Sequence, residues 1–191
     1  MSKTAFKGSA MLNPVPAVLI TSKMGDKVNV FTAAWVGTAC TKPAMITVSI
    51  RPERLSYDFI CASKEMTINL PTRKIVRAVD FCGVKSGRDV DKIEACSFTL
   101  EEGVLIDVPS IKECPVSMEC KVKDIIPLGS HDLFLAEVLQ VNVDNKIIHK
   151  DGKIHFEEAD LICYSHGEYF SIENSPLGKF GYSIKKRRGK K

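Results

Sequence analysis

Short runs of apolar and β-branched residues, separated by Pro, Gly and polar clusters, recur along this chain. Within several of these runs, apolar and polar positions alternate with a period of two, which is the pattern of a strand buried on one face. The longest alternating runs flank the turn-forming segment 127–130 and predict a hairpin. The strands predicted in this way are 15–22, 28–36, 45–51, 66–70, 116–126, 131–143 and 161–164.

Helical periodicity is confined to short segments between these strands. Residues 56–63 are predicted to form a helix with Ser56 as its N-cap, and two further helices are expected at 72–81 and 90–95. The strands follow one another without a βαβ rhythm and without an internal repeat. The pattern therefore predicts a mainly β fold, an antiparallel barrel or sandwich with peripheral helices.

The length and composition indicate one domain with a sizeable core, since 45% of the 191 residues are hydrophobic. We expect this domain to cover residues 1–184, followed by a basic disordered tail at 185–191. No apolar run approaches the roughly 18–20 residues of a membrane span. Residues 1–8 also lack the apolar stretch of a secretory signal. These features predict a cytoplasmic protein with no membrane partner.

The net charge of +4 arises in the tail. Residues 185–191 carry six of the 27 basic residues, which leaves 21 basic against 23 acidic residues in the body, a net charge of −2. A basic tail can bind nucleic acid, and the alternative is an ordinary solvated terminus. Because the body shows no basic stripe, nucleic acid is not expected as a partner.

The cysteines and histidines do not show metal-binding spacings. The cysteine count is odd, no two are spaced Cys-x-x-Cys, and reduced, mostly buried thiols are expected. The histidines form no recognised zinc motif, so no metal site is predicted. The cysteines are residues 40, 61, 82, 96, 114, 120 and 163, and the histidines are residues 131, 149, 155 and 166.

The first segment with candidate chemistry is Asn29-Val-Phe-Thr-Ala-Ala-Trp35. It supplies an amide, a hydroxyl and the only indole of the chain within one predicted strand. Thr32, Ala33 and Ala34 have small side chains that let a flat ring approach the backbone closely. Trp35 is then either a wall of a cofactor site or an ordinary core or interface residue.

The second segment, Ser49 to Tyr57, leaves a strand at Pro52 and enters a predicted helix. Arg51 lies before the break, and the Ser56 hydroxyl and the first N–H groups of the helix follow it. A phosphate group is stabilised by such a combination of charge and peptide donors. The alternative is a capped surface helix with solvated arginines. Taken with the first segment, this anion site indicates a phosphorylated aromatic cofactor, and flavin chemistry in particular.

Several segments together resemble the flavin reductase-like, FMN-binding split-barrel family, and most closely its flavoredoxin branch. They follow the family's order and span about residues 10–182 of the chain. The matching segments are 29–35, 48–57, Thr67-Ile-Asn-Leu-Pro71, 81–92, Gly129-Ser-His-Asp-Leu-Phe134 and Leu177-Gly-Lys-Phe-Gly-Tyr182.

The resemblance implies an antiparallel split barrel that forms a homodimer and holds FMN near the subunit interface. Asn29, Thr32 and Trp35 would line the isoalloxazine ring, and Tyr164 would pack near it. The remaining residues would hold the ribityl-phosphate arm or complete the polar shell. Lys92 and His131 belong to that polar shell only through the resemblance, since by position alone they read as a surface charge and a solvated turn residue. The cofactor-binding residues expected are Asn29, Thr32, Ala33, Ala34, Trp35, Ser49, Ile50, Arg51, Ser56, Tyr57, Lys92, His131 and Tyr164.

Three functions are compatible with this family. The first is an oxidoreductase that takes hydride from NADH or NADPH onto FMN and passes electrons to an acceptor. The second is a flavoredoxin-type electron carrier that receives electrons from another redox protein and does not oxidise NAD(P)H itself. The third is a flavin-binding protein without catalytic activity.

Overall fold

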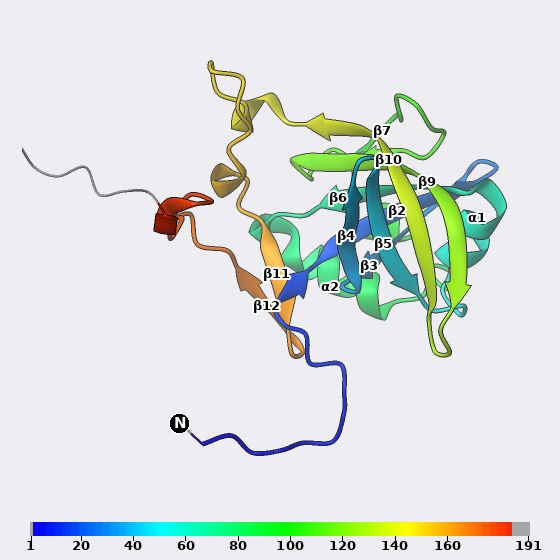
Figure 1. Cartoon of the computed structure of the whole chain (residues 1–191). Coiled ribbons are helices and arrows are strands. Elements are labelled where there is room, and N and C mark those ends of the chain that lie inside the picture. Colours follow the sequence, from blue (N-terminus) through cyan, green and yellow to red (C-terminus); the bar gives the residue numbers. More distant parts are fainter. Residues whose placement is uncertain (1, 185–191) are drawn as a thin grey trace, which may run out of the picture.

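A seven-stranded antiparallel sheet forms the centre of the computed structural model, which describes residues 2–184 (Figure 1). The order of its strands is β3-β2-β6-β9-β10-β5-β4. Its strands are β2 (Val18–Met24), β3 (Lys27–Ala33), β4 (Val36–Thr41), β5 (Ala44–Ile50), β6 (Glu65–Leu70), β9 (Val116–Pro127) and β10 (Asp132–Val143).

Smaller elements surround this sheet. A three-stranded sheet of order β1-β11-β12 and the pair β7-β8 lie outside it, and the helices are short. The small strands are β1 (Val15–Pro16), β7 (Leu100–Glu101), β8 (Ser110–Ile111), β11 (Ile162–Ser165) and β12 (Glu168–Ser171). The helices are α1 (Leu55–Ser63), α2 (Val76–Val84), α3 (Lys92–Ala95) and four 3-10 helices, η1 (Arg73–Ile75), η2 (Asn145–Ile147), η3 (Phe156–Glu158) and η4 (Tyr182–Ile184).

The hairpin of β9 and β10 is the longest pairing in the sheet, and the sequence predicted it. Each strand has 12 residues, and in the turn between them Leu128 N donates to His131 O at 3.1 Å. Gly129 adopts φ +106°, a conformation that favours glycine. Two register shifts along the pair, near Ala136 and Gln140, mark bulges, which increase twist and help a sheet to curl.

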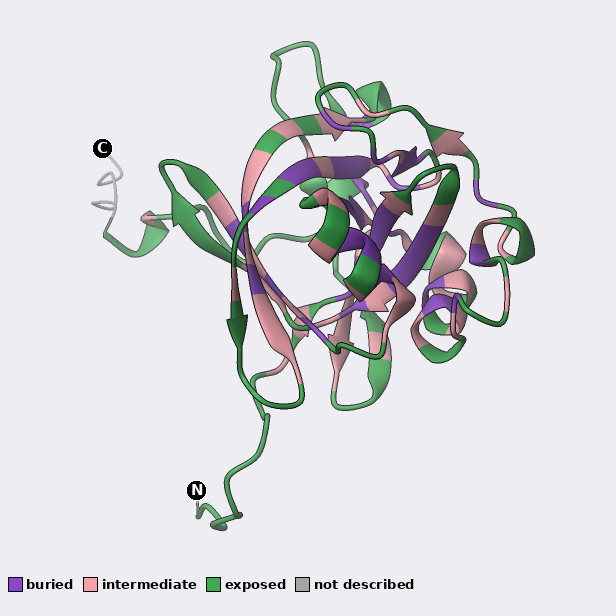
Figure 2. Cartoon of the chain, turned by 90° about the vertical axis from the view of Figure 1, so that its right-hand side faces the viewer, coloured by how far each residue is buried: buried purple, intermediate pink, exposed green. Residues whose placement is uncertain are grey.

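The inner face of the curled sheet holds the main core. Along β5 the buried residues Ile46, Val48 and Ile50 alternate with less buried neighbours, as the period-two pattern predicts. In Figure 2 the buried segments gather in the middle of the barrel. A second cluster lies between the sheet and α2, where Leu19 and Val30 meet apolar residues of the helix. The fold is thus mainly β and antiparallel, which confirms the predicted class.

Three strands, β4, β7 and β12, escaped the sequence analysis. The strand predicted to run to residue 36 ends at Ala33, and the chain turns before β4, where Trp35 O accepts from Ser49 N at 2.9 Å. All three are short or exposed strands, where the alternation of buried and exposed positions is weak.

The predicted N-cap of the first helix is wrong. Helix α1 begins at Leu55, its N-cap is Arg54, and no side chain caps its N-terminus. Ser56 is instead fully buried and used in tertiary hydrogen bonds. The second predicted helix begins as the 3-10 turn η1 and continues as α2 three residues beyond its predicted end, while the third is reduced to α3.

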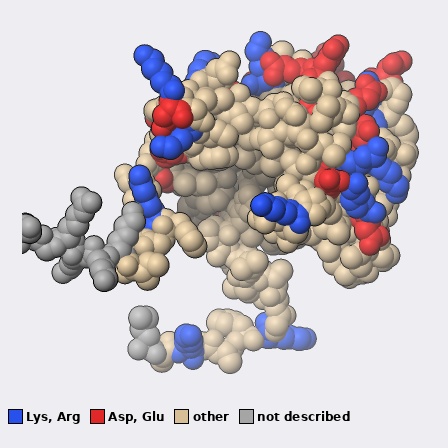
Figure 3. Space-filling view, turned by 45° about the horizontal axis from the view of Figure 1, so that its top comes forward, with Lys and Arg blue, Asp and Glu red and all other residues tan. Residues whose placement is uncertain are grey.

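The surface and the cysteines agree in part with the sequence predictions. All seven cysteines are free, three of them are buried, and Cys40 is exposed. On the face shown in Figure 3, basic and acidic side chains are interspersed over the body. None of the helices within residues 2–184 is long and apolar enough to cross a membrane. The predicted basic tail at 185–191 lies outside the described residues.

One buried carboxylate ties the loop before β8 to the sheet. Glu119 on β9 is fully buried and accepts hydrogen bonds from Val104 N at 2.9 Å and Leu105 N at 2.7 Å. Asn142 Nδ2 on β10 donates to the same carboxylate at 2.9 Å. Burial alone would raise the pKa of Glu119, but these donors outweigh it, and the pKa lies below its ordinary value.

We expect Glu119→Gln to lower the free energy of unfolding by about 1.5–3 kcal/mol at pH 7, because an amide oxygen replaces a charged acceptor. Since the folded-state pKa is depressed, this contribution is present above the unfolded pKa of about 4.3 and is lost as pH falls through the folded value. Urea unfolding at pH 7 and at about pH 3 measures it. A difference between variant and wild type that stays constant across this range would contradict the assignment.

Candidate functional site

A pocket of about 530 Å³ opens where three parts of the chain meet. Strand β3 forms one side, the turn from β5 into α1 forms the second, and the end of α2 with the following loop forms the third. A pocket of this volume lies within the usual range for small-molecule and cofactor sites. Its lining residues are Asn29, Phe31, Arg51, Glu53, Arg54, Leu55, Val84, Lys85, Ser86, Gly87 and Lys92.

Lys92 is the most informative residue of this pocket. Its side chain is only 3% exposed, and its Nζ donates to Cys82 O at 2.9 Å. No carboxylate within residues 2–184 forms an ion pair with it. Burial lowers the pKa of Lys92 to about 8, and the nearby Arg54 guanidinium also lowers it. Because buried charges are normally paired, this ammonium indicates a site for an anion.

Further basic side chains line the same pocket as Lys92. Arg51 and Arg54 come from the turn into α1, and neither forms an ion pair among the described residues. Lys85 adds a third cation, and Glu53 is the one acidic side chain that lines the pocket. His131 lies close to these arginines. Its pKa is lowered by partial burial and by the charge of Arg51, so the imidazole is mainly neutral at pH 7.

The floor of the pocket is held by a short chain of buried hydrogen bonds. Asn29 Nδ2 donates to Ser56 Oγ at 2.8 Å, and the Ser22 hydroxyl donates to the same oxygen at 2.7 Å. On its other side, Asn29 meets Gly87, where an added Cβ would lie 2.1 Å from Asn29 Oδ1. Ser56 therefore lies behind Asn29 and orients it, and the pocket wall itself is formed by Asn29.

The loop after α2 is anchored to the opposite wall. Arg88 on this loop forms an ion pair with Asp58 of α1, with Nη2 and Oδ2 2.8 Å apart. The Ser86 hydroxyl accepts from Arg88 N at 3.1 Å, which shapes the turn that carries Ser86 and Gly87 into the pocket. The two sides of the mouth are thus linked across the opening.

Three of the residues predicted from the sequence line this pocket, namely Asn29, Arg51 and Lys92. Others lie around it. Trp35 is 39% exposed at the turn from β3 to β4, and Ala33 and Ile50 are buried in the main core. Ala34, between β3 and β4, and Ser49, near the end of β5, are partly buried.

Thr32 and Tyr57 have partners of their own. The Thr32 hydroxyl donates to Val79 O on α2, and the Tyr57 hydroxyl donates to Asp132 Oδ2 at 2.6 Å. This bond is the main reason that the pKa of Tyr57 is raised. Since Asp132 pairs with Ile50, Tyr57 secures the junction of β5, β10 and α1.

Tyr164 lies away from the pocket lining. It is on β11 and packs edge to face against Tyr169, with ring centroids 5.5 Å apart, beside the cluster between the sheet and α2. The sequence analysis also did not select the loop residues Lys85, Ser86 and Gly87 as site residues. These three residues lie in the segment 81–92, which is one of the segments that resemble the family. The periodicity of the residues themselves did not indicate a site.

Residues 11–173 of the chain match the family model of the flavin reductase like domain. The chain belongs to this family. An uncharacterised protein of Pyrococcus abyssi is 35% identical over 168 residues, which cover 88% of this chain and 96% of the relative.

Two solved structures of the family superpose closely on the chain. Flavoredoxin of Desulfovibrio vulgaris (Miyazaki F) is 28% identical, with a TM-score of 0.89 over 96% of this chain and 100% of the flavoredoxin. The FMN-binding domain of a flavin reductases-like enzyme from Shewanella baltica is 25% identical, with a TM-score of 0.73 over 86% and 89% of the two chains. The fold is therefore the flavin reductase-like split barrel that the sequence resemblance implied, and the family is one of flavoproteins.

The residues present fit a phosphorylated flavin. The pocket joins apolar surface from Phe31, Leu55 and Val84 to a basic wall with a buried ammonium. Such an arrangement matches a ligand with an aromatic part and an anionic part. It differs from the sequence prediction in two respects. Arg54 and Lys92 both contribute to the basic lining, and Ser56 lies behind Asn29.

Proposed function

We propose that this chain is an FMN-binding oxidoreductase that transfers electrons through the bound flavin. The observation that carries this proposal is the buried ammonium of Lys92, which needs an anion and lies beside Arg51 and Arg54 in a pocket that also has apolar walls. The phosphate of FMN supplies that anion. When bound, the flavin supplies the redox chemistry, while the protein orients it and adjusts its electrostatic surroundings.

FMN fits this pocket better than FAD on two grounds. The anion site is formed by single side chains at one end of a pocket, which suits a terminal phosphomonoester. The chain also lacks the glycine-rich strand–turn–helix motif with which many proteins bind a dinucleotide. The Shewanella baltica relative is described as an FMN-binding domain, which supports the same choice.

The protein's own residues have three tasks in this proposal. Lys92, Arg51 and Arg54 bind the phosphate. Asn29, held by Ser56, presents its amide to the ligand at the pocket floor. The remaining predicted residues, Trp35 above all, would complete the ring site at the turn from β3 to β4, where its indole is partly exposed.

Two candidate functions differ in their electron donor. In the first, NADH or NADPH delivers hydride to the flavin, as expected for a flavin reductase-like protein. In the second, the chain is a carrier that exchanges electrons with another redox protein, and its 28% identity to a flavoredoxin over nearly its full length supports this alternative. We propose the reductase, because the matching family model over residues 11–173 is that of the flavin reductase like domain, and keep the carrier as the alternative.

We further propose that the active species is a homodimer. The segments before β1 and after β12 extend from the body and carry fully exposed apolar side chains, such as Leu12, Leu177 and Phe180 (Figure 1). Exposed apolar side chains gathered on extended segments are typical of an interface with another chain. A second copy of this chain would cover them and would close the flavin site from outside.

The phosphate contact can be separated from general damage to the pocket by comparing FMN with riboflavin. We expect Lys92→Met and Arg51→Ala each to weaken FMN binding by about 1.5–3 kcal/mol, roughly ten- to a hundredfold, and to leave riboflavin affinity almost unchanged. Ser56→Ala should weaken both ligands by a similar factor, because it releases Asn29. Fluorescence titration of the apoprotein measures all three.

Lys27→Met, which removes an exposed lysine of β3, serves as the matched control and should bind both flavins like wild type. The pH dependence gives a second readout. Because the pKa of Lys92 is about 8, wild-type FMN affinity should fall as pH rises through 8, whereas Lys92→Met should lose this dependence. Equal losses of FMN and riboflavin affinity in Lys92→Met would refute the phosphate contact.

The donor can be identified from the absorption of the purified holoprotein under anaerobic conditions. For the reductase, NADH or NADPH added alone should bleach the visible flavin band within the time of catalytic turnover, because hydride passes directly to the ring. For the carrier, the band should persist with both nucleotides and disappear with a chemical reductant. Persistence of the band with both nucleotides would support the carrier instead of the reductase. A purified protein that contains no flavin would contradict both functions.

The dimer predicts a mass of twice the 21.1 kDa of one chain in sedimentation equilibrium at micromolar concentration. Replacing Leu177 and Phe180 together with serine should shift the equilibrium towards the monomer, because these side chains are exposed within one chain. Replacing the exposed surface residues Lys150 and Lys153 with serine is the control. A wild-type monomer that retains its flavin would contradict the proposal.

A further inference from the structure

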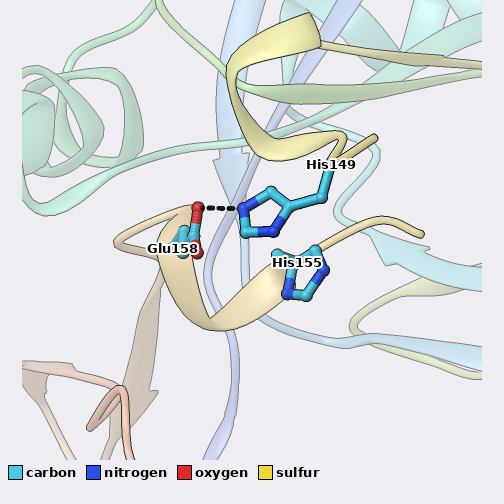
Figure 4. Close-up of side chains that lie close together, drawn as sticks. All are labelled: His149, His155 and Glu158. Carbon is cyan, nitrogen blue, oxygen red and sulfur yellow. Dashed lines mark hydrogen bonds and ion pairs between the residues drawn. The ribbon is translucent and has the colours of Figure 1, made fainter. Parts of the chain in front are cut away.

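A cluster of two histidines and a glutamate lies outside the flavin pocket, in the segment between β10 and β11. His149, His155 and Glu158 each offer one ligand atom, and these atoms lie within 4.8 Å of one another (Figure 4). The sequence analysis predicted no metal pattern among the histidines, because the spacing of these three residues matches no established motif. The tertiary fold brings together three residues that their spacing in the sequence did not connect.

The backbone explains why the two imidazoles meet. Ile148 and Ile154 form an antiparallel bridge, so that the chain makes a small hairpin with Gly152 at its tip. His149 follows Ile148 in the chain, and His155 follows Ile154. Their imidazole rings stack with centroids 3.7 Å apart and an angle of 22° between the ring planes. Helix η3 then turns Glu158 back towards His149.

The hydrogen bonds leave lone pairs directed into the cluster. His149 Nε2 lies 3.0 Å from Glu158 Oε2, and His155 Nδ1 lies 2.8 Å from Glu157 Oε1. The bond to Glu157 favours a proton on Nδ1 and leaves the lone pair on Nε2. This nitrogen, His155 Nε2, is buried and has no hydrogen-bond partner within the described residues. A buried polar atom without a partner needs an explanation, and a bound cation provides one.

We infer that His149, His155 and Glu158 bind one divalent transition-metal ion, with Zn²⁺ as the best match. Two imidazole nitrogens and one carboxylate oxygen form a ligand set that Zn²⁺ accepts, with a fourth position open to water. Tetrahedral bonds of about 2.0–2.2 Å place ligand atoms roughly 3.4 Å apart. The His149–Glu158 pair already lies at that scale. His155, whose ring stacks on that of His149, would join the same ion by rotation of its partly exposed side chain.

Glu157 acts as the outer partner of this site. Metal-binding histidines commonly donate their second ring N–H to a carboxylate, which orients the ring and increases its basicity. The 2.8 Å contact of Glu157 with His155 Nδ1 has this arrangement. The metal would link the 148–154 hairpin to η3.

The test is calorimetric titration of the untagged, chelator-treated full chain with Zn²⁺. The chain carries Cys40→Ser, which removes the exposed thiol as a competing ligand. We expect one Zn²⁺ per chain, and we expect Mg²⁺ to bind far more weakly because it prefers oxygen ligands. Glu157→Gln should weaken Zn²⁺ binding about 10- to 100-fold. His149→Ala, His155→Ala and Glu158→Gln should each weaken it more than that.

His166→Asn is the matched control, because His166 is an exposed histidine outside the cluster whose positive φ of 50° asparagine tolerates. It should bind Zn²⁺ like the parent chain. Glu158→Gln conserves shape, so a loss of binding with an unchanged circular dichroism spectrum reports the ligand itself. Zn²⁺ should also raise the melting temperature of the parent chain and not that of Glu158→Gln. Absence of Zn²⁺ binding, or binding that all three ligand variants retain, would overturn the inference.

Discussion

The ammonium of Lys92 is almost wholly buried, and its hydrogen bond within the described residues goes to the carbonyl oxygen of Cys82. Removing such a charge from water is unfavourable unless an anion compensates it. None of the described carboxylates forms an ion pair with Lys92, and Arg51 and Arg54 add further positive charge to the same pocket. The pocket is therefore suited to an anionic ligand, and burial lowers the pKa of Lys92.

The barrel makes this arrangement rigid. Strand β3 carries Asn29, α2 supplies the carbonyl that orients Lys92, and the pairing of Ile50 with Asp132 sets the point at which the chain leaves β5 towards Arg51. Tyr57 reinforces that point through its bond to Asp132. Because these contacts join separate parts of the chain, the charged side chains reach the pocket from elements that are tied to one another, an arrangement that favours precise placement of a ligand.

The histidine cluster, in another part of the chain, also contains a buried polar group that lacks a full set of partners. There a buried nitrogen without a partner and a carboxylate-oriented ring lie together in a loop segment that contributes nothing to the flavin pocket. In both places the described structure leaves a polar group unsatisfied that folding alone would be expected to pair. An anion suits the first and a cation the second, and the two can be examined independently.

The sequence by itself determined most strands of the main sheet, the long β9–β10 hairpin, the mainly β class and the family, because local periodicity and ordered motifs are properties of contiguous residues. It also selected Asn29, Arg51 and Lys92. Only the tertiary structure decided that Ser56 lies behind Asn29 and does not cap α1. It also decided that Trp35 lies in the turn between β3 and β4, and that His149, His155 and Glu158 lie close together. These outcomes depend on contacts between distant residues and on the burial of particular atoms, and no local pattern records either one.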